Sequence, residues 1–459
     1  MSEKKKIYKP GPISGFPEWL PEYRAVELAW LDKIRAVFES YGYGSIETPA
    51  VEELEVIAAK GEDVDKEIYV LERLHKEDGD KDARLALHFD QTVPFARYVA
   101  QHFSELTFPF KRYQMQKVWR GERPQMGRMR EFYQCDIDVI HQDNLPIHFD
   151  AEVAAVCYEA LAALDIGRVQ LRVSNRKIMK GYFEALGMKA EGLLAVVISN
   201  IDKIAKIGEE QVTKNIFDYI QENQIEIDDK LYAETIGRFL VLAGSKYSSS
   251  EDFLSGMRQL QILYIKLQNN QTFNEGVEEL SFVMDQLSHL PQGSVVADLS
   301  IVRGLDYYTG TVYETALLDV PEFTGSVCSG GRYDDLAGSY INKHLPGVGI
   351  SIGFTRLFDV LRQAGKIQPG PKSPAQVLVV LPSEEQRGAA AEAARLLRER
   401  GMNVELYHAP QKVGKQVGYA EKKGIPYVWF PPFEDGQDHE VKDMGSGEQV
   451  QADPKVWSA

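Results

Sequence analysis

The stretch VWRGERPQMGRMREFYQCDIDVI, residues 118–140, decides the fold of the chain. Apolar and polar residues alternate on both sides of its centre, as they do in strands whose two faces differ. The centre is rich in arginine and glycine and contains a proline, which favours a loop. One face of the second strand would carry Tyr133, Cys135, Ile137 and Val139, and the other face Gln134, Asp136 and Asp138. From Tyr113 to Val139, the pattern predicts two strands joined by an arginine-rich loop, with one packed face and one polar face.

The loop carries an unusual charge. Four arginines and one glutamate between Arg120 and Arg130 give it a formal charge of +3, in a chain whose net charge is −16. The ordinary interpretation is a solvated hairpin tip that pairs with the acidic surface around it. The alternative follows from the polar strand face beside it, because guanidinium groups bind phosphates through paired hydrogen bonds. This alternative predicts a site for a phosphorylated substrate.

Composition limits the class of protein. The 459 residues exceed the usual size of one hydrophobic core, which predicts two or three domains. Hydrophobic residues make up 44% and charged residues 26%, without a long apolar run, so we expect a globular protein and no membrane partner. The three cysteines lack metal-ligand spacing and the first residues do not resemble a signal peptide, which predicts a cytoplasmic location. The negative charge argues against DNA as a partner and leaves room for a local basic surface.

Helix and strand signals divide the chain into sections. Residues 22–40 have a helical apolar stripe, and a short strand that stops near Pro49 follows. Residues 171–290 are mainly helical and interrupt strand-like segments, which predicts an inserted helical module. A strand that enters a helix is expected at 347–363. From about Pro374, alternating strands and helices predict a separate domain with a small parallel or mixed sheet.

Three further segments hold residues that are capable of chemistry. RGLDYYTGTVYE (303–314) presents an acid and two tyrosines, CSGGRYDDLAG (328–338) a pair of glycines, and GVGISIGFTRLF (347–358) glycines at a strand–helix junction. Each has an ordinary interpretation as a tight turn or as close packing, and a glycine pattern alone is a weak signal. The sequence contains no Gly-Lys-Ser/Thr phosphate loop, no zinc-ligand spacing and no nucleophile elbow.

Two of these segments point to a family. RGLDYYTG (303–310) and SGGRYDDL (329–336) resemble signatures of the histidyl-tRNA synthetases, which are class II aminoacyl-tRNA synthetases. Residues 22–49, 118–140 and 347–361 are similar to the three class II motifs, in the same order. The resemblance covers nearly the whole chain.

The resemblance implies an α/β multidomain fold. Its parts would be a class II antiparallel catalytic sheet flanked by helices, a helical insertion and a C-terminal α/β anticodon-binding domain. The expected boundaries are 1–170 and 291–365 for the two parts of the catalytic domain, 171–290 for the insertion, 366–373 for a linker and 374–459 for the anticodon-binding domain.

The resemblance also implies the activity: ATP-dependent ligation of L-histidine to histidine tRNA through histidyl-adenylate, with release of AMP and diphosphate. Arg120 would bind the α-phosphate of ATP, Glu122 would lie near the adenine amino group, and Arg356 would bind the γ-phosphate. Arg128 would take further phosphate charge, and Arg303 would act with Arg120 as a catalytic residue at the α-phosphate. Mg²⁺ is expected with ATP, and no metal ligand from the protein can be assigned. Fixed guanidinium groups would stabilise the charge that develops on the phosphate oxygens in the transition state.

Such a site could select histidine through hydrogen bonds to its imidazole ring. A neutral imidazole has one N–H donor and one acceptor nitrogen, which a buried carboxylate and a tyrosine hydroxyl complement. The resemblance assigns Asp138 to the N–H group and Tyr307 and Tyr308 to the ring pocket. It assigns the α-amino and carboxylate groups of the substrate to Asp90, Thr92 and Gln134.

Two residues beside Asp90 depart from the family pattern. His88 stands where arginine is expected, and Gln91 stands where leucine or glycine is usual.

Contacts with tRNA are expected at two places. Arg123 and Gln125 resemble family residues at the acceptor end of histidine tRNA. In the C-terminal domain, the ordinary interpretation of a basic helix is a solvated face, and the alternative is the anticodon-binding surface. That surface would consist of Lys412, Lys415, Lys422 and Lys423, with Gln416 as a polar reader.

Other functions remain open at this stage. A regulatory paralogue without aminoacylation activity would be expected to lose catalytic arginines or the anticodon-binding domain, and this sequence keeps Arg120, Arg303 and Arg356. A class II synthetase for another amino acid would lack the two histidine signatures. The resemblance also implies a homodimer, to which the apolar stripe of residues 22–40 would contribute, although ordinary core packing explains that stripe equally well.

Overall fold

The computed structural model describes residues 8–58, 67–74, 84–187, 193–201, 204–223, 225, 236–239, 241–242, 244–301, 308–335, 337–338, 340–434 and 436–459. The chain divides into two compact units. The first consists of Met1–Pro17 and Asp32–Ile367, and the second of Glu18–Leu31 and Gln368–Ala459.

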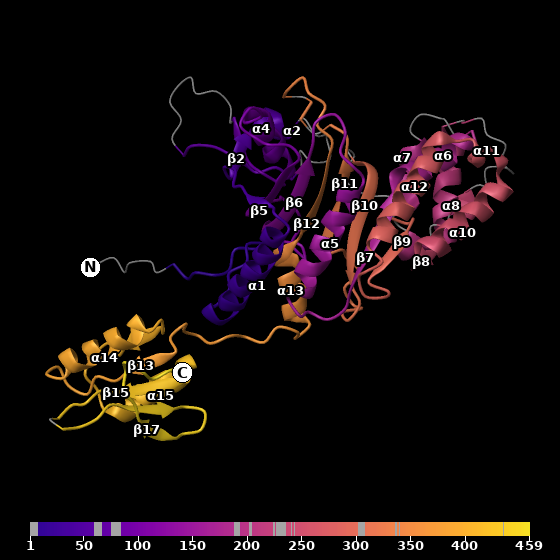
Figure 1. Ribbon diagram of the computed structural model, residues 1–459. Helices are drawn as coiled ribbons and strands as arrows, with labels where there is room; N and C mark the ends of the chain where they lie inside the picture. The colour runs from indigo at the N-terminus through magenta and orange to yellow at the C-terminus, as the bar shows by residue number, and fades with distance from the viewer. Residues whose placement is uncertain are drawn as a thin grey trace. The chain divides into compact units, whose positions relative to one another are not determined.

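A nine-stranded sheet is the centre of the first unit (Figure 1). The strand order is β1 (Gly44–Ser45), β5 (Phe110–Trp119), β6 (Glu131–Ile140), β12 (Gly347–Ile352), β11 (Cys328–Tyr333), β10 (Tyr308–Leu317), β7 (Val169–Asn175), β9 (Val295–Asp298) and β8 (Lys246–Tyr247). Neighbours from β5 to β7 are antiparallel, whereas β1 with β5 and β7 with β9 are parallel. The antiparallel catalytic sheet is therefore confirmed.

The hairpin of β5 and β6 is the pair of strands predicted between Tyr113 and Val139. Its register places Arg112 opposite Asp138 and Gln116 opposite Gln134. On the other side of β6, β12 pairs in antiparallel fashion and leads into α13 (Phe354–Gln363), which is the strand and helix expected at 347–363. The hairpin and this strand–helix unit together bring distant parts of the sequence to the middle of the sheet.

Helices pack along the sheet and fix its apolar face. The helix predicted at 22–40 is α1 (Pro21–Ser40), and its last turns contact β5: the Phe38 and Tyr113 ring centroids are 5.8 Å apart, and the Tyr113 hydroxyl donates to Glu39 at 2.7 Å. α5 (His148–Ala162) and α13 also lie along the sheet (Figure 1). Buried Cys135, Ile137 and Val139 on β6 form part of this packed face.

The polar face of β6 is buried as well, because α4 (Thr92–Gln101) covers the region of Arg112. The Phe95 ring of α4 lies 4.3 Å from the Arg112 guanidinium carbon. A small sheet in the order β2 (Val51–Glu53), β4 (Leu85–Leu87) and β3 (Val70–Leu71), with α2 (Leu54–Ala58), precedes α4 in the chain. The loop between β4 and α4 carries Asp90.

The inserted helical module begins at Arg176 rather than at residue 171, because residues 171–175 belong to β7 of the central sheet. Its helices are α6 (Arg176–Ala185), α7 (Leu193–Ile201), α8 (Ile204–Glu222), α10 (Ser250–Leu263), α11 (Ile265–Gln268) and α12 (Gln271–Gln286). Glycine allows α6 and α12 to pack closely: a Cβ at Gly181 would lie 2.3 Å from Phe273 N, and a Cβ at Gly276 2.8 Å from Ile178 N.

The second unit contains the mixed sheet that was expected after Pro374. Its order is β14 (Val404–Leu406), β13 (Val377–Val379), β15 (Tyr427–Phe430), β16 (Glu440–Asp443) and β17 (Gln449–Gln451). The first three strands are parallel, and the last two add in antiparallel fashion. α14 (Arg387–Glu399) and α15 (Val413–Lys423) complete the alternation of strands and helices.

Gly181→Ala is expected to destabilise the helical module by about 1–3 kcal/mol, because the added methyl group forces α6 away from α12. Gly418→Ala is the matched control: a Cβ at this position of α15 meets no atom within 4 Å, and alanine favours a helix. Urea unfolding followed by circular dichroism measures both variants. Unfolding of Gly181→Ala at the wild-type urea concentration would contradict the packing argument.

Candidate active site

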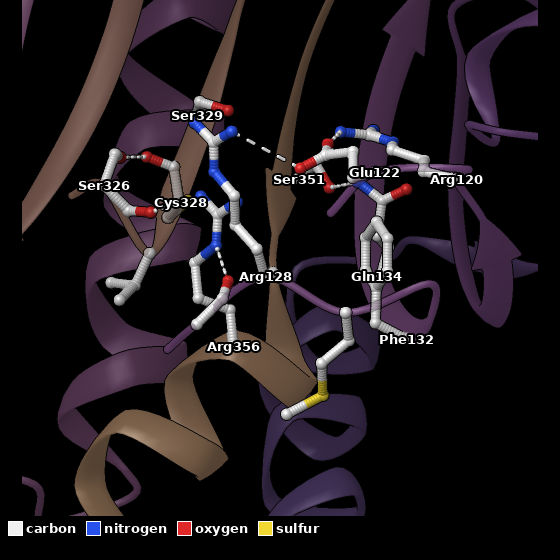
Figure 2. Close-up of a pocket in the computed structure, with 14 residues that line it drawn as sticks. Arg120, Glu122, Arg128, Phe132, Gln134, Ser326, Cys328, Ser329, Ser351 and Arg356 are labelled. Carbon is white, nitrogen blue, oxygen red and sulfur yellow. Dashed lines mark hydrogen bonds and ion pairs between the residues drawn. The ribbon is translucent and has the colours of Figure 1, made fainter. Parts of the chain in front are cut away.

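A pocket opens where the arginine-rich loop meets β6, β11, β12 and α13 (Figure 2). It encloses about 570 Å³ of space, part of which is open to solvent. The lining residues are Arg120, Glu122, Gly127, Arg128, Met129, Phe132, Gln134, Ser326, Val327, Cys328, Ser329, Ser351, Gly353 and Arg356. Four predicted ATP-binding residues are among them: Arg120, Glu122, Arg128 and Arg356.

The tip of the loop is a tight turn that α13 holds in place. Gln125 N donates to Arg128 O at 3.1 Å, and Arg128 N donates to Gln125 O at 2.8 Å. Gly127 has φ +70°, a conformation that side chains rarely adopt. Arg356 donates from Nε to Gly127 O at 2.7 Å and from NH1 to Ser326 O at 3.0 Å. This side chain therefore joins the loop to the segment before β11.

Positive charge dominates the pocket. Arg120 and Arg128 lie 3.9 Å and 3.5 Å from the two carboxylate oxygens of Glu122 (Figure 2), and among the lining residues, all of them described, Glu122 is the only acid. Burial, followed by the charges of Arg120 and Arg128, lowers the pKa of Arg356. Three guanidinium groups against one carboxylate leave a net positive charge that favours a polyanion.

Arg120 is held rigidly at the edge of this pocket. Its Nε donates to Phe89 O at 3.0 Å, and its guanidinium carbon lies 5.1 Å from the centroid of the Phe132 ring. These two contacts fix the plane of the guanidinium group and leave its terminal N–H groups available for an oxyanion.

A second polar region lies further along β6 and is centred on Asp138. Its Oδ2 lies 2.5 Å from Arg112 NH2, and its Oδ1 accepts from the Tyr333 hydroxyl at 3.0 Å. Burial raises the pKa of Asp138 to about 6, although Arg112 and the Tyr333 hydroxyl oppose the shift. The carboxylate is therefore a buried, oriented acceptor.

Two glycines leave room beside Asp138. Gly349 is its neighbour on β12, where a Cβ would lie 2.0 Å from Asp138 Oδ1, and Gly331 is opposite Gly349 on β11. A Cβ at Gly331 would lie 2.8 Å from the Tyr308 ring. The glycines of the 328–338 segment thus lie in a strand and not in a turn. They allow a carboxylate and a tyrosine ring to lie close to the sheet.

The loop before α4 brings Asp90 to the same strand. Asp90 Oδ1 accepts from Val93 N at 3.0 Å, in the first turn of α4, which starts at Thr92. Gln91, which is fully buried, donates from Nε2 to Gln116 O at 2.9 Å and to Gln134 O at 3.1 Å. Its departure from the family pattern therefore has a structural consequence: the amide ties the Asp90 loop to β5 and β6.

His88 makes a second tie between this loop and β5. Its Nε2 is 2.7 Å from Lys117 O, and its ring stacks on Trp119 with a centroid distance of 5.5 Å. Burial lowers the pKa of His88, which favours the neutral ring. The two residues that depart from the family pattern thus support the loop from both sides of Asp90.

Comparison with known proteins identifies the family. The family model described as "Histidyl-tRNA synthetase" matches residues 15–357, and the model described as "Anticodon binding domain" matches residues 376–455. The chain belongs to the histidyl-tRNA synthetase family.

Relatives match over almost the whole length. The chain is 52% identical to the histidine–tRNA ligase of Thermobifida fusca over 100% of both sequences, and 45% identical to that of Micrococcus luteus over 97% of this chain and 95% of the relative. The crystal structure of histidyl-tRNA synthetase from Nostoc sp. PCC 7120 matches with a TM-score of 0.84 at 40% identity, over 97% of both chains.

Some residues that the family resemblance assigns are not part of the pocket. Arg303 and Tyr307 lie outside the described residues. Arg123 and Gln125 are exposed at the hairpin tip. Within the described ranges, no three His, Cys, Asp or Glu side chains are grouped to hold a metal ion. No helix in that part of the chain is long and apolar enough to cross a bilayer.

The expectation for Gln416 was wrong. This side chain is fully buried, donates to Leu381 O at 2.9 Å and Gln411 O at 2.7 Å, and accepts from Leu381 N at 2.8 Å. All its hydrogen-bonding atoms serve the fold of the second unit, because a buried amide requires partners. Lys412, Lys415 and Lys422 are exposed, whereas Lys423 pairs with Glu405 at 3.0 Å.

Sequence reasoning missed several residues of the site, among them Gln91, Arg112, Tyr333 and Ser351. Arg112 and Ser351 face Asp138 and Asp136 across strand pairs, so only the register reveals them. Alternation along a single strand gives the face of a residue and not its neighbour on the next strand.

Gln91→Leu, which restores the usual apolar residue, is expected to lower the free energy of unfolding by about 1–3 kcal/mol. Two side-chain hydrogen bonds to β5 and β6 are lost, each worth about 0.5–1.5 kcal/mol. Gln286→Leu, at an exposed position of α12, is the control. Urea unfolding of both variants is the measurement, and an unchanged or higher stability of Gln91→Leu would refute the structural role of the amide.

Proposed function

We propose that this chain activates L-histidine with ATP to form histidyl-adenylate and then transfers histidine to histidine tRNA, with AMP and diphosphate released. One observation carries the proposal. A cationic pocket for phosphates and a buried carboxylate for an imidazole share one strand, β6, with Gln134 on the pocket wall and Asp138 further along the same face. Membership of the histidyl-tRNA synthetase family supports both halves of the reaction.

At the phosphate end, we assign Arg120 and Arg303 to the α-phosphate and Arg356 to the γ-phosphate. Attack by the histidine carboxylate spreads negative charge over the α-phosphate oxygens, and preorganised guanidinium groups stabilise that state. The fixed plane of Arg120 and the two backbone bonds of Arg356 support these roles, since both groups are oriented before substrate binds. Arg128 would take further phosphate charge, and Glu122 would accept from the adenine amino group.

Mg²⁺ would be held mainly by ATP itself. The ion commonly binds substrate phosphates together with one or two carboxylates and several waters. Glu122, the single acid of the pocket lining, is assigned to the adenine amino group, so we assign no lining residue to the ion. When bound with ATP, Mg²⁺ would neutralise charge on the phosphates that leave as diphosphate.

At the amino-acid end, we assign the imidazole N–H to Asp138 and the ring to Tyr308 and Tyr307. An ionised, fully buried carboxylate rejects a ring that lacks the donor, because the carboxylate would then lose a hydrogen bond. We assign the α-amino and carboxylate groups of histidine to Asp90, Thr92 and Gln134. Asp90 and Gln134 each keep one buried oxygen without a hydrogen-bond partner, which supports this assignment.

The tRNA would contact two surfaces. Arg123 and Gln125, exposed on the hairpin tip beside the pocket, suit the acceptor end. The second unit would bind the anticodon, and the exposed side chains of Lys412, Lys415 and Lys422 would contact the tRNA. We further propose a cytoplasmic homodimer; sedimentation over a concentration series that gives only the monomer mass would refute the dimer.

ATP–diphosphate exchange without tRNA, run with each of the twenty amino acids, tests the proposed function. Exchange is expected with histidine alone. Arg120→Ala should reduce it by about 10²-fold or more, because a preorganised charge is lost from the transition state. Arg395→Ala, an exposed position of α14, is the control and should retain activity. Absence of exchange from folded wild-type protein would favour a regulatory paralogue instead.

Tyr333→Phe should shift the pH dependence of kcat/KM for histidine. The Tyr333 hydroxyl donates to Asp138 and lowers its pKa, so removal should raise that pKa above the wild-type value of about 6. The ionised carboxylate is the form that accepts the N–H group. Activity should therefore be lost at a higher pH as the solution is acidified. Parallel profiles at saturating ATP, with Tyr41→Phe as the control, measure the shift, and superimposable profiles would contradict it.

A further inference from the structure

Three buried side-chain oxygens without a hydrogen-bond partner belong to two adjoining segments of the site. They are Asp90 Oδ2, Gln134 Oε1 and Asp136 Oδ1, in residues that are 5%, 8% and 4% exposed. A buried acceptor without a donor costs about 1–3 kcal/mol, so such a group requires an explanation. The segments are tied together because Gln91, next to Asp90, donates to Gln134 O.

Each of the three side chains is held by its other polar atom. Asp90 Oδ1 accepts from Val93 N, and Gln134 Nε2 donates to Ser351 Oγ at 2.7 Å. Asp136 hydrogen-bonds to Ser351, its neighbour across the β6–β12 pair. One oxygen of each group therefore remains unused while the orientation of the group is fixed. Gln134 and Ser351 both line the pocket (Figure 2). Asp136 lies two residues after Gln134 on β6 and therefore on the same face of the strand.

The charges of the region are not balanced. The charged groups that act on Asp136 are Arg112 from β5, Asp138 from its own strand and Asp90 from the loop before α4. Among these described groups, Arg112 is the single cation, and it already pairs with Asp138 at 2.5 Å. Asp90 and Asp136 thus bring two further carboxylates to this region, and Arg112 is already paired.

A primary ammonium group meets both requirements. It brings one positive charge and three N–H donors, which match the three unused oxygens. We propose that Asp136 is a further substrate-binding residue, whose carboxylate binds the α-ammonium group of the amino acid together with Asp90 and Gln134. This inference rests on the proposed function, because it assigns the α-ammonium group of the substrate histidine to Asp136, in the middle of β6.

The protonation of Asp136 gives a readout that a structural role would not produce. Burial raises the pKa of Asp136 to about 7, with Asp138 and Asp90 adding to the shift and Arg112 and Ser351 opposing it. Near pH 7 the empty site therefore holds a partly protonated carboxyl group. Arrival of an ammonium group favours the carboxylate, so histidine binding should release a fraction of a proton to the buffer from this residue.

The experiment compares two ligands, histidine and its des-amino analogue 3-(imidazol-4-yl)propionate, by isothermal titration calorimetry of the full chain. The variants are Asp136→Asn and Asp136→Ser, and Gln286→Asn is the matched control on an exposed helix position. Asp136→Asn should raise the dissociation constant of histidine at least tenfold and leave that of the analogue within about twofold of the wild-type value. Titrations in two buffers of different ionisation enthalpy should show less proton release by Asp136→Asn than by wild type.

Thermal unfolding provides a further check. Asp136→Asn removes a carboxylate that lacks a positive partner. The variant should therefore have an unchanged or higher midpoint of thermal unfolding without ligand, although it binds histidine more weakly. Equal weakening of both ligands, or no weakening of histidine, in folded Asp136→Asn and Asp136→Ser would overturn the inference. Absence of histidine binding by the wild-type chain would instead refute the proposed function, and the inference with it.

Discussion

The ion pair between Arg112 and Asp138 connects the two strands on which the site depends. It joins opposite positions of β5 and β6, and Arg112 is fully buried beneath the Phe95 ring of α4. An isolated buried carboxylate would take up a proton or lie elsewhere, because burial of a charge is costly. Arg112 and the Tyr333 hydroxyl make an ionised Asp138 possible under neutral conditions. The buried guanidinium group of Arg112 therefore allows Asp138 to be a buried, ionised acceptor that could select an imidazole.

The two ends of the site have opposite charge. Around the loop, three guanidinium groups face one carboxylate, and further along β6 three carboxylates face Arg112. ATP is a polyanion, and an amino acid presents its ammonium group beside the carboxylate that reacts. A cationic group of side chains beside the start of β6 and an anionic group further along it would therefore orient both substrates toward the same point. Gln134, a neutral residue, lies between the two ends and belongs to both.

Much of this arrangement could be predicted from the sequence, and the limits have physical causes. Period-two alternation predicted β5 and β6, and β12 was expected as a strand that enters a helix. The loop charge beside a polar strand face suggested a site for a phosphorylated substrate, and the roles of Arg120 and Arg128 came from the family resemblance. Burial of the polar face could not be predicted, because Gln134, Asp136 and Asp138 would suit solvent equally well, and their burial depends on elements from other parts of the sequence. The same ambiguity led to the wrong expectation for Gln416. The sequence does not distinguish a helical glutamine that contacts a ligand from one that hydrogen-bonds to the backbone of the protein, as Gln416 does with Leu381.

Several buried groups that lack hydrogen-bond partners gather around the loop before α4 and the adjoining part of β6. His88 Nδ1 and Gln91 Oε1 join the oxygens of Asp90, Gln134 and Asp136 in one region, although the same residues use their other atoms to fix the loop. Each such group costs stability in the empty protein, so the site is held in place by the rest of the sheet. Ligand binding then recovers energy that the fold has left unused. Preorganised acceptors of this kind would favour binding of a small amino acid with few contacts, because little rearrangement is required on binding.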